Sequence, residues 1–172
     1  MHAAKMTFLI CYDDHRGFTD DVRKRFSDPA RYNVVSFHTR QEFLNHCNKE
    51  IENNSCKVAI IGVYETRDQF DNVLDLASEV KKTDPKTGLI LLVPDDKMDD
   101  LKKIVKFNID AYIPLNANTI LRLHNAVKKL ISEYNLVIFR KRRNLSVYVM
   151  IGFLIISAII ILISRLKIPE YF

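Results

Sequence analysis

The sequence contains few of the patterns by which enzymes hold phosphate groups, metals or reactive thiols. Only four of its 172 residues are glycine, and none falls in the GxGxxG or GxxxxGK spacing of a phosphate-binding loop. The three cysteines, Cys11, Cys47 and Cys56, lack metal-ligand spacing, which favours reduced, buried thiols. The histidines lack such spacing too. We therefore predict that the chain is not an enzyme and binds no cofactor.

Positive charge is concentrated in one short cluster. The formal net charge is +5, and Arg140, Lys141, Arg142 and Arg143 supply four positive charges, so the rest of the chain is nearly neutral. A basic cluster beside an apolar segment is typical of contact with anionic lipid headgroups. We predict this contact for the four residues, and no nucleic-acid partner.

The apolar segment, residues 145–164, contains no charged side chain. A helix of that length, at about 1.5 Å per residue, matches the roughly 30 Å of a bilayer's hydrocarbon core. The stronger basic flank precedes the segment, which by the positive-inside rule places the preceding part in the cytoplasm. The sequence predicts a single-pass, tail-anchored protein of the cytoplasmic (inner) membrane: a cytoplasmic domain over 1–132, a helical stalk with the basic cluster over 133–144, a transmembrane helix over 145–164 and a short non-cytoplasmic tail over 165–172.

Short apolar runs alternate with amphipathic stretches through the predicted domain. We expect strands at 6–12, 32–37, 57–63, 88–93 and 111–113, and helices at 19–27, 40–53, 66 to Pro85, 97–107 and from 118 onward. Thr19 and Thr39 are the expected N-caps of the first two helices. Such strict alternation predicts an α/β fold, with a parallel sheet covered by helices on both faces.

Two local features connect this pattern to a family. The first strand runs into Asp13 and Asp14, and the fifth lies in the segment IDAYIP. With the five strand-helix units, these features resemble the receiver domains of two-component response regulators, over residues 5–132. The resemblance implies a flavodoxin-like (βα)5 doubly wound parallel sheet, in the order 2-1-3-4-5, with the site at the carboxyl ends of the strands.

Receiver domains transfer a phosphoryl group to an aspartate, which requires a cation and a hydroxyl to balance the charge on the phosphoryl oxygens. The resemblance places the magnesium-binding acids at Tyr12 and Asp13, or at Asp13 and Asp14 in a frame shifted by one residue. It places the phosphoacceptor, the hydroxyl and the lysine at residues that lack these groups: Gly62 for the first, Val93 or Pro94 for the second, and Leu115 for the third.

These departures predict a pseudo-receiver, which keeps the fold and has lost phosphoryl transfer. Asp13 and Asp14 remain a weak candidate for a divalent metal, together with Asp95 and Asp96. One alternative is therefore an atypical phospho-switch that uses Asp13 or Asp14 as the acceptor.

The predicted partner is a protein. The resemblance places a docking face around Lys102 to Lys106, Tyr112 and Arg122. The last cytoplasmic helix carries an apolar heptad stripe that ends with Tyr134 and Val137, which indicates pairing with a second copy or with another membrane protein. The function we expect is a phosphorylation-independent interaction and localisation module, or scaffold, in a bacterial signalling or membrane assembly. A structural subunit of a larger membrane complex is the other alternative.

Overall fold

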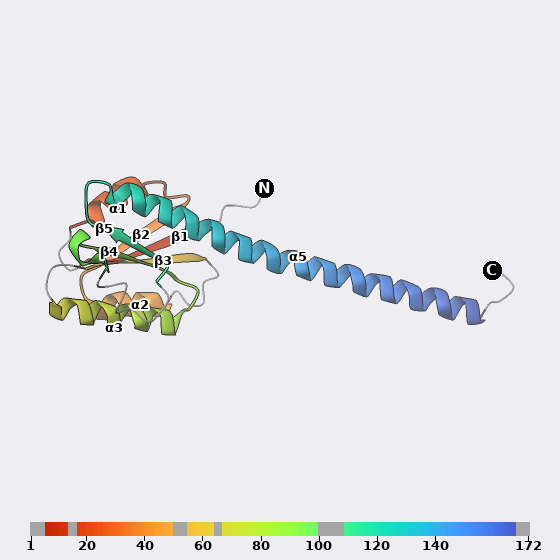
Figure 1. Cartoon of the computed structure of the whole chain (residues 1–172). Helices are drawn as coiled ribbons and strands as arrows, with labels where there is room; N and C mark the ends of the chain where they lie inside the picture. Colours follow the sequence, from red (N-terminus) through yellow and green to blue (C-terminus); the bar gives the residue numbers. More distant parts are fainter. Residues whose placement is uncertain (1–5, 14–16, 50–54, 64–66, 100–108, 168–172) are drawn as a thin grey trace. The chain divides into compact units, whose positions relative to one another are not determined.

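The computed structural model of the chain describes residues 6–13, 17–49, 55–63, 67–99 and 109–167, without the side chains of 48–49, 67–71, 141–142, 145–146 and 164–167. The chain divides into two compact units, Met1–Ile131 and Ser132–Phe172. The first unit contains the sheet and the helices packed against it, which together position the candidate site (Figure 1).

Five parallel strands form the sheet of the first unit, in the order β2-β1-β3-β4-β5. The strands are β1 (Thr7–Tyr12), β2 (Tyr32–Phe37), β3 (Cys56–Gly62), β4 (Gly88–Val93) and β5 (Ala111–Pro114). This order and the parallel pairing confirm the predicted flavodoxin-like sheet. Every residue of β3 and β4 is buried, as expected for central strands covered on both faces.

The helices cover both faces of the sheet. They are α1 (Thr19–Arg25), α2 (Arg40–Lys49), α3 (Arg67–Thr83), the short 3-10 helix η2 (Asp95–Lys97) and α5 (Thr119–Lys167). Figure 1 shows α1 and the start of α5 on one face, with α2 and α3 on the other. Most of the helix expected at 97–107, including Leu101, Ile104 and Val105, lies outside the described residues, as do Ile51 and Thr66.

Alternate residues of each central strand enter two separate packing layers. Ile10, Ala59 and Leu91 belong to the cluster that packs against α2 and α3 through Phe43, Leu44, Cys47, Val73, Leu76, Ala77 and Val80. The intervening strand residues, such as Leu9 and Ile60, are equally buried, as are Val22 of α1 and Leu123 and Val127 of α5. Because successive strand residues point to opposite faces, these form the second layer.

Close approach of α5 to the sheet explains one glycine. A Cβ atom on Gly88, the first residue of β4, would lie 2.8 Å from Cδ1 of Leu130 and 3.5 Å from the carbonyl oxygen of Lys57. The absence of a side chain at Gly88 therefore allows Leu130 to pack over the start of β4. The first half of the predicted apolar stripe thus serves the fold of the first unit.

The predicted boundaries of α1 and β5 were wrong for identifiable reasons. Thr19 does not cap α1: Phe18 is the N-cap residue, its own side chain makes no capping bond, and α1 ends at Arg25 instead of Ser27. The fifth strand, expected at 111–113, extends one residue further, so that Pro114 is the last residue of β5, opposite Val93. Proline is tolerated there because β5 is an edge strand, so a missing N–H on its outer side leaves the ladder to β4 intact.

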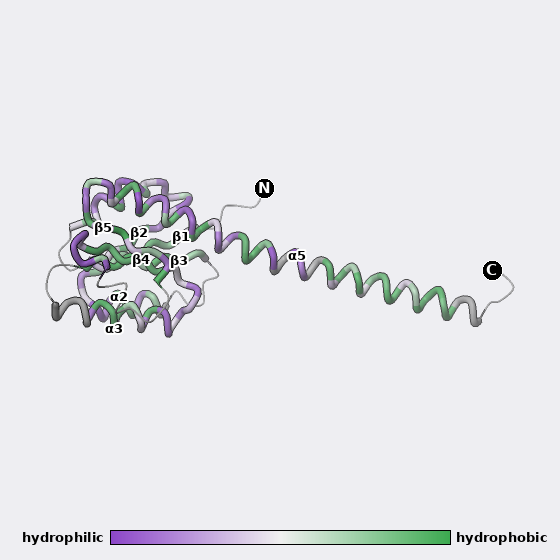
Figure 2. The backbone as a smooth tube through the Cα atoms, in the orientation of Figure 1, coloured by the Kyte–Doolittle hydropathy of each residue, from purple (hydrophilic) through white to green (hydrophobic). Residues whose placement is uncertain are grey.

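α5 continues through the second unit as a single helix of 49 residues. Figure 2 shows that its C-terminal half is mostly hydrophobic. In the part of the chain that the structure describes, no helix is sufficiently long and apolar to cross a membrane. The predicted span 145–164 includes Leu145, Ser146 and Ser164, whose side chains lie outside that part, and the tail from 168 lies outside it altogether.

Candidate functional site

The carboxyl ends of the strands bring the predicted site positions to one edge of the sheet. Tyr12 at the end of β1 pairs with Ile61, which places the next residue, Asp13, level with Gly62 at the end of β3. Gly62 pairs with Leu92 of β4. Further along, Leu115 donates its backbone N–H to the carbonyl oxygen of Val93 at 2.8 Å. A parallel sheet therefore gathers these positions as the receiver resemblance implies.

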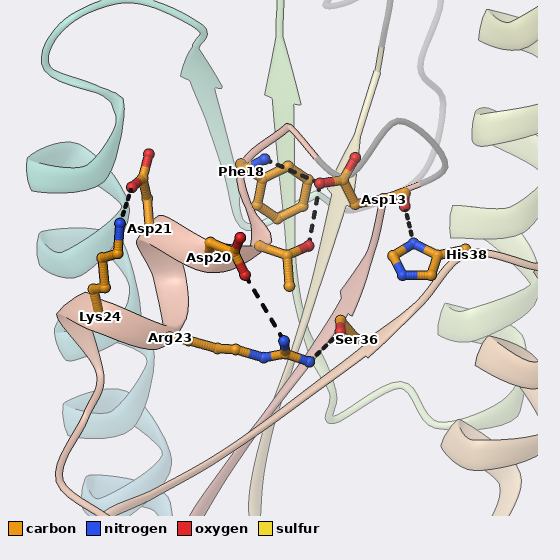
Figure 3. A network of polar contacts seen from close by, with 9 residues as sticks. Asp13, Phe18, Asp20, Asp21, Arg23, Lys24, Ser36 and His38 are labelled. Carbon is orange, nitrogen blue, oxygen red and sulfur yellow. Dashed lines mark hydrogen bonds and ion pairs between the residues drawn. The ribbon is translucent and has the colours of Figure 1, made fainter.

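Asp13 is fully buried, and its carboxylate is bound from within the chain. Oδ2 accepts a hydrogen bond from the backbone N–H of Phe18 at 3.0 Å (Figure 3). It also accepts one from the hydroxyl of Thr19 at 3.1 Å. Helix N-termini expose backbone N–H groups that lack an intrahelical acceptor, and negative charge is favoured near them. Asp13 thus serves as the acceptor at the start of α1 from the end of a neighbouring strand.

The backbone of Asp13 is held on its other side by the end of β2. Its N–H donates to the carbonyl oxygen of Phe37 at 3.0 Å. Its carbonyl oxygen accepts from Nδ1 of His38 at 2.5 Å, so Nδ1 carries the proton of that ring (Figure 3). Three segments of the chain therefore fix the position of Asp13.

Sequence reasoning missed this arrangement because it considered Thr19 as an acceptor at the N-cap. The hydroxyl of Thr19 is instead a donor to a residue six positions earlier. The sequence did contain a signal for it: an acidic residue directly after a buried strand, followed after one short loop by a threonine at the start of a helix. The pattern admits two meanings, a metal ligand or a helix acceptor, and only the geometry distinguishes them.

The other predicted positions carry no group suited to phosphoryl transfer. Gly62 has no side chain, and Val93, fully buried at the end of β4, has no hydroxyl. Pro94 is the residue before η2, and Leu115, at the position of the lysine, is half-buried. At these four described positions the sequence therefore supplies no carboxylate, hydroxyl or ammonium group.

The metal candidates are not assembled by the described residues. Asp14 lies outside them, and Asp95 and Asp96 are exposed in η2. Within the described ranges, no group of three or more His, Cys, Asp or Glu side chains could hold a metal ion.

The cysteines are free and buried. Burial, with a smaller effect of the Asp13 carboxylate, raises the pKa of Cys11 to about 12. Burial also raises the pKa of Cys47 to about 12 and that of Cys56 to about 11. The thiolate is the nucleophilic form of cysteine, so these thiols are poorly reactive near neutral pH.

The predicted partner-binding residues belong to different units or lie outside the description. Lys102 and Lys106 are not described. Tyr112 is half-buried in β5, where burial raises its pKa, and Arg122 is exposed on α5. Tyr134 and Val137 belong to the second unit, in which Val137 is 64% exposed. In the basic cluster Arg140 and Arg143 are exposed, whereas the side chains of Lys141 and Arg142 are not described.

A second polar network, which the sequence did not suggest, lies at the amino ends of the strands. Nζ of Lys57, a buried residue of β3, lies 3.3 Å from Oδ2 of Asp84. Nζ of Lys81 lies 2.8 Å from Oδ2 of Asp110, which also accepts from the N–H of Leu89 at 2.7 Å. These contacts tie the end of α3 to the starts of β3, β4 and β5.

The charge of Asp84 is stabilised in this network. Burial by itself would raise the pKa of its carboxyl. Hydrogen bonds from the N–H of Lys86, the hydroxyl of Thr87 and Nζ of Lys57 outweigh that effect, so the pKa lies below its usual value. The network stabilises the edge of the sheet that lies opposite the candidate site.

Comparison with known proteins supports the fold assignment. No protein-family model and no curated relative matches the sequence. The structure is similar to a response regulator receiver domain from Clostridium thermocellum, with a TM-score of 0.60, 20% identity, and coverage of 77% of this chain and 99% of that one. A CheY-like receiver domain from Methanospirillum hungatei JF-1 matches with a TM-score of 0.54, 18% identity, and coverage of 76% and 97%. An adenylate cyclase structure from Rhodopirellula baltica matches with a TM-score of 0.61, 12% identity, and coverage of 78% and 94%.

These likenesses define the class. The first unit of the chain, which includes the start of α5, has the receiver fold of response regulators. At these levels of identity the likeness concerns the fold, and function has to be argued from the residues at the site.

Proposed function

We propose that the chain is a receiver-like signalling module that binds a protein partner without accepting a phosphoryl group. One observation carries the proposal: the carboxylate of Asp13, at the position of a magnesium-binding acid, accepts hydrogen bonds from Phe18 and Thr19 at the start of α1. The aligned position on β3 is Gly62, which offers no acceptor oxygen in a side chain. A pseudo-receiver of this kind signals by contact and location.

The proposal is tested by exposing the full chain in detergent micelles to acetyl phosphate and Mg²⁺ and measuring its intact mass. We expect no phosphoryl adduct, whereas a phosphorylatable receiver treated in parallel gains one. A stable adduct would contradict the proposal. If that adduct disappeared in Asp13→Asn or Asp14→Asn, the alternative of an atypical phospho-switch would replace it.

We further propose that α5 anchors the module in the cytoplasmic membrane. Large apolar side chains between Val147 and Ile163 are exposed over the second unit, with fractions from 45% to 71%. Exposed Arg140 and Arg143 precede them, where anionic headgroups would meet a basic flank. The receiver-like domain would then be held at the cytoplasmic side.

The same helix offers a surface for association, which we propose is used by a second copy or another membrane protein's helix. Leu136, Val137 and Phe139 are exposed by 55%, 64% and 65%, and they precede the basic cluster. Contiguous exposed apolar surface usually marks an interface. This surface equally suits the alternative of a structural subunit, in which the helix contributes more than the domain.

A further inference from the structure

The two edge strands of the sheet differ in how their outer sides are protected against pairing. β5 has four residues and ends in Pro114, and a short length and a proline both discourage the addition of another strand. β2, at the opposite edge, has six residues and pairs with β1 residue by residue, without a bulge. Its sequence, YNVVSF, contains no proline, no glycine and no charged side chain. β2 therefore lacks the features that commonly keep an edge strand unpaired.

The hydrogen bonds between β1 and β2 show which backbone groups of β2 point outward. The N–H of Thr7 donates to the carbonyl oxygen of Arg31 at 2.8 Å, and the N–H of Asp13 donates to that of Phe37 at 3.0 Å. Along a strand, successive residues direct their N–H and C=O groups to opposite sides, so the odd-numbered residues of β2 face β1. The outward residues are Tyr32, Val34 and Ser36.

Two of these three residues have outward groups without a partner in the described part of the chain. The N–H of Tyr32 donates to the carbonyl oxygen of Asp28 at 2.9 Å, but no backbone hydrogen bond joins the outer side of Val34 or Ser36 to a described residue. The hydroxyl of Ser36 accepts from Nη2 of Arg23 at 2.6 Å (Figure 3). Strand side chains stand on the faces of a sheet, so that contact lies over the α1 face and not along the edge. Two N–H and two C=O groups therefore remain for a further strand.

Aromatic contacts hold β2 from both faces of the sheet. Tyr32 meets Phe26, the residue after α1, with ring centroids 5.0 Å apart, and Phe26 also meets His124 at 5.5 Å, where α1 and α5 join. On the other face, Phe37 meets Phe43 of α2 at 6.5 Å. The strand is thus fixed before any partner binds, which lowers the entropy lost when another strand is added.

We propose that the outer edge of β2 pairs in antiparallel fashion with β2 of a second copy of this chain. Val34 of each copy exchanges N–H···O bonds with Ser36 of the other, which gives four hydrogen bonds around a two-fold axis at Val35. The two sheets then become one continuous sheet. This interface belongs to the first unit, whereas the association surface proposed on α5 belongs to the second.

The charges around β2 favour a second copy as the occupant. Like charges that face each other across a strand pair are destabilising, and a strand that pairs with itself brings equal charges together. No Asp, Glu, Lys or Arg occurs between Arg31 and Arg40, so a pair centred on Val35 opposes no charges over its length. The two flanking arginines each have a carboxylate partner in their own chain, Asp28 at 3.3 Å and Glu79 at 3.0 Å respectively.

The size of this contact predicts a weak association. A pair of short strands is a small interface beside the roughly 1,600 Å² that stable protein complexes typically bury. Copies held close together in one membrane by α5 would pair more readily, because the effective concentration is higher there. A covalent trap is therefore the suitable test.

Val35→Cys in the full chain provides that trap. Facing residues of a non-hydrogen-bonded antiparallel pair have Cα atoms about 4.5 Å apart, a distance that a disulfide can bridge. Under mild oxidation of concentrated protein in detergent micelles, we expect dimers whose disulfide joins the two introduced thiols, as mapped by mass spectrometry. Asn33→Cys is the matched control, since residue 33 is more exposed and on the same face. In this register its two copies lie about 14 Å apart, so its dimer yield should be about tenfold lower or less.

A proline on the outer side tests the hydrogen bonds directly. Val34→Pro removes an outward N–H from each copy and leaves the ladder to β1 intact, so it should lower the dimer yield of Val35→Cys by about tenfold. Circular dichroism verifies folding, and Ser36→Pro, the same change at the other outward position, serves if Val34→Pro does not fold. Equal yields from Val35→Cys and Asn33→Cys, an undiminished yield in a folded proline variant, or a monomeric Val35→Cys would each overturn the proposal. Association through α5 and the acetyl phosphate result do not involve β2, so this inference and the proposed function fail separately.

Discussion

The carboxylate of Asp13 and the hydroxyl of Thr19, six residues apart, form a hydrogen bond of 3.1 Å that joins the end of β1 to the first residue of α1. The same carboxylate oxygen accepts from the N–H of Phe18. In this chain the residue at the position of a receiver's magnesium-binding acid therefore holds the start of α1 to the end of β1. A change at Asp13 should lower the stability of the first unit.

Asp13→Ala is expected to destabilise the first unit by about 2 kcal/mol, because it removes a buried acceptor and leaves two donors unpaired. Thr19→Val should cost about 1 kcal/mol, since Phe18 still donates to the carboxylate. Urea unfolding followed by circular dichroism measures both, and the double variant should show coupling between them. Asp20→Ala, whose side chain is 82% exposed, is the control and should change stability by less than about 0.5 kcal/mol. Equal effects of the three changes would contradict this role of Asp13.

The Lys57–Asp84 pair should be asymmetric under substitution. The Lys57 side chain is 4% exposed and that of Asp84 is 21% exposed, so Asp84→Asn leaves a buried ammonium without its counter-charge, at a cost of about 3 kcal/mol. Lys57→Met should cost less, because Thr87 and Lys86 still donate to Asp84. The pair Arg40–Glu79, with side chains 44% and 48% exposed, is the control at under about 1 kcal/mol. A larger loss from Lys57→Met than from Asp84→Asn would contradict the argument.

Acid titration tests the same network. The pKa of Asp84 is lowered in the folded chain, so its contribution to stability is complete above the unfolded value near 3.8 and is lost as pH falls through the folded pKa. Urea midpoints measured from pH 5 downward should fall less steeply in Asp84→Asn than in wild type. Parallel decline of the two proteins would show that Asp84 is not responsible.

The strands could be predicted because each run of apolar residues in the sequence coincides with a strand of the sheet. β2 and β4 have the bounds that their apolar runs predicted, and the others differ by one residue. Apolar runs of this length between turn signals leave few alternatives, and right-handed crossovers then fix the layers. The order 2-1-3-4-5, however, came from the receiver resemblance, which the parallel pairings support.

The roles of individual polar residues were less predictable because they depend on contacts between distant segments. Asp13 meets Phe18 and Thr19 through a loop, and Arg25 meets His124 across 99 positions of the sequence. Neither contact follows from a local pattern, since an acid after a strand is as compatible with a metal site as with a helix acceptor. The sequence alone did show that Gly62, Val93 and Leu115 lack the carboxylate, hydroxyl and amine that the receiver resemblance would require at those positions.

Protonation of His124 should loosen the junction of α1 and α5. Burial, Arg25 and Lys128 lower its pKa below 6.5, so the folded chain favours the neutral ring. Its contribution to stability is therefore complete above pH 6.5 and is lost as pH falls through the folded pKa. Thermal melts from pH 7.5 to 5 should show a decline that His124→Gln reduces. An unchanged pH profile in His124→Gln would contradict this assignment.

Crosslinking tests association through α5. Val137→Cys should form disulfide-linked dimers in membranes under mild oxidation, since its side chain is 64% exposed on the proposed surface. Asn135→Cys, two residues away and on a different face of the helix, is the matched control. The native thiols can remain, because burial raises the pKa of Cys11 and Cys47 to about 12 and of Cys56 to about 11. Absence of dimers for Val137→Cys would remove the second copy as partner and leave another membrane protein.

If α5 anchors the chain in the membrane, charged residues introduced into its apolar segment should prevent that anchoring. The full chain should sediment with membranes and resist extraction by alkaline carbonate. The double substitution Ile155→Arg and Ile159→Arg should release the chain from the membrane, because each arginine at the centre of a span opposes insertion by about 3 kcal/mol. In the structure these two isoleucine side chains are 55% and 52% exposed. Leu at both positions preserves the apolar surface and should leave the chain in the pellet. If wild type were extracted by carbonate as readily as the arginine variant, α5 would have to be covered by protein, as in a larger complex, and the anchor would be abandoned.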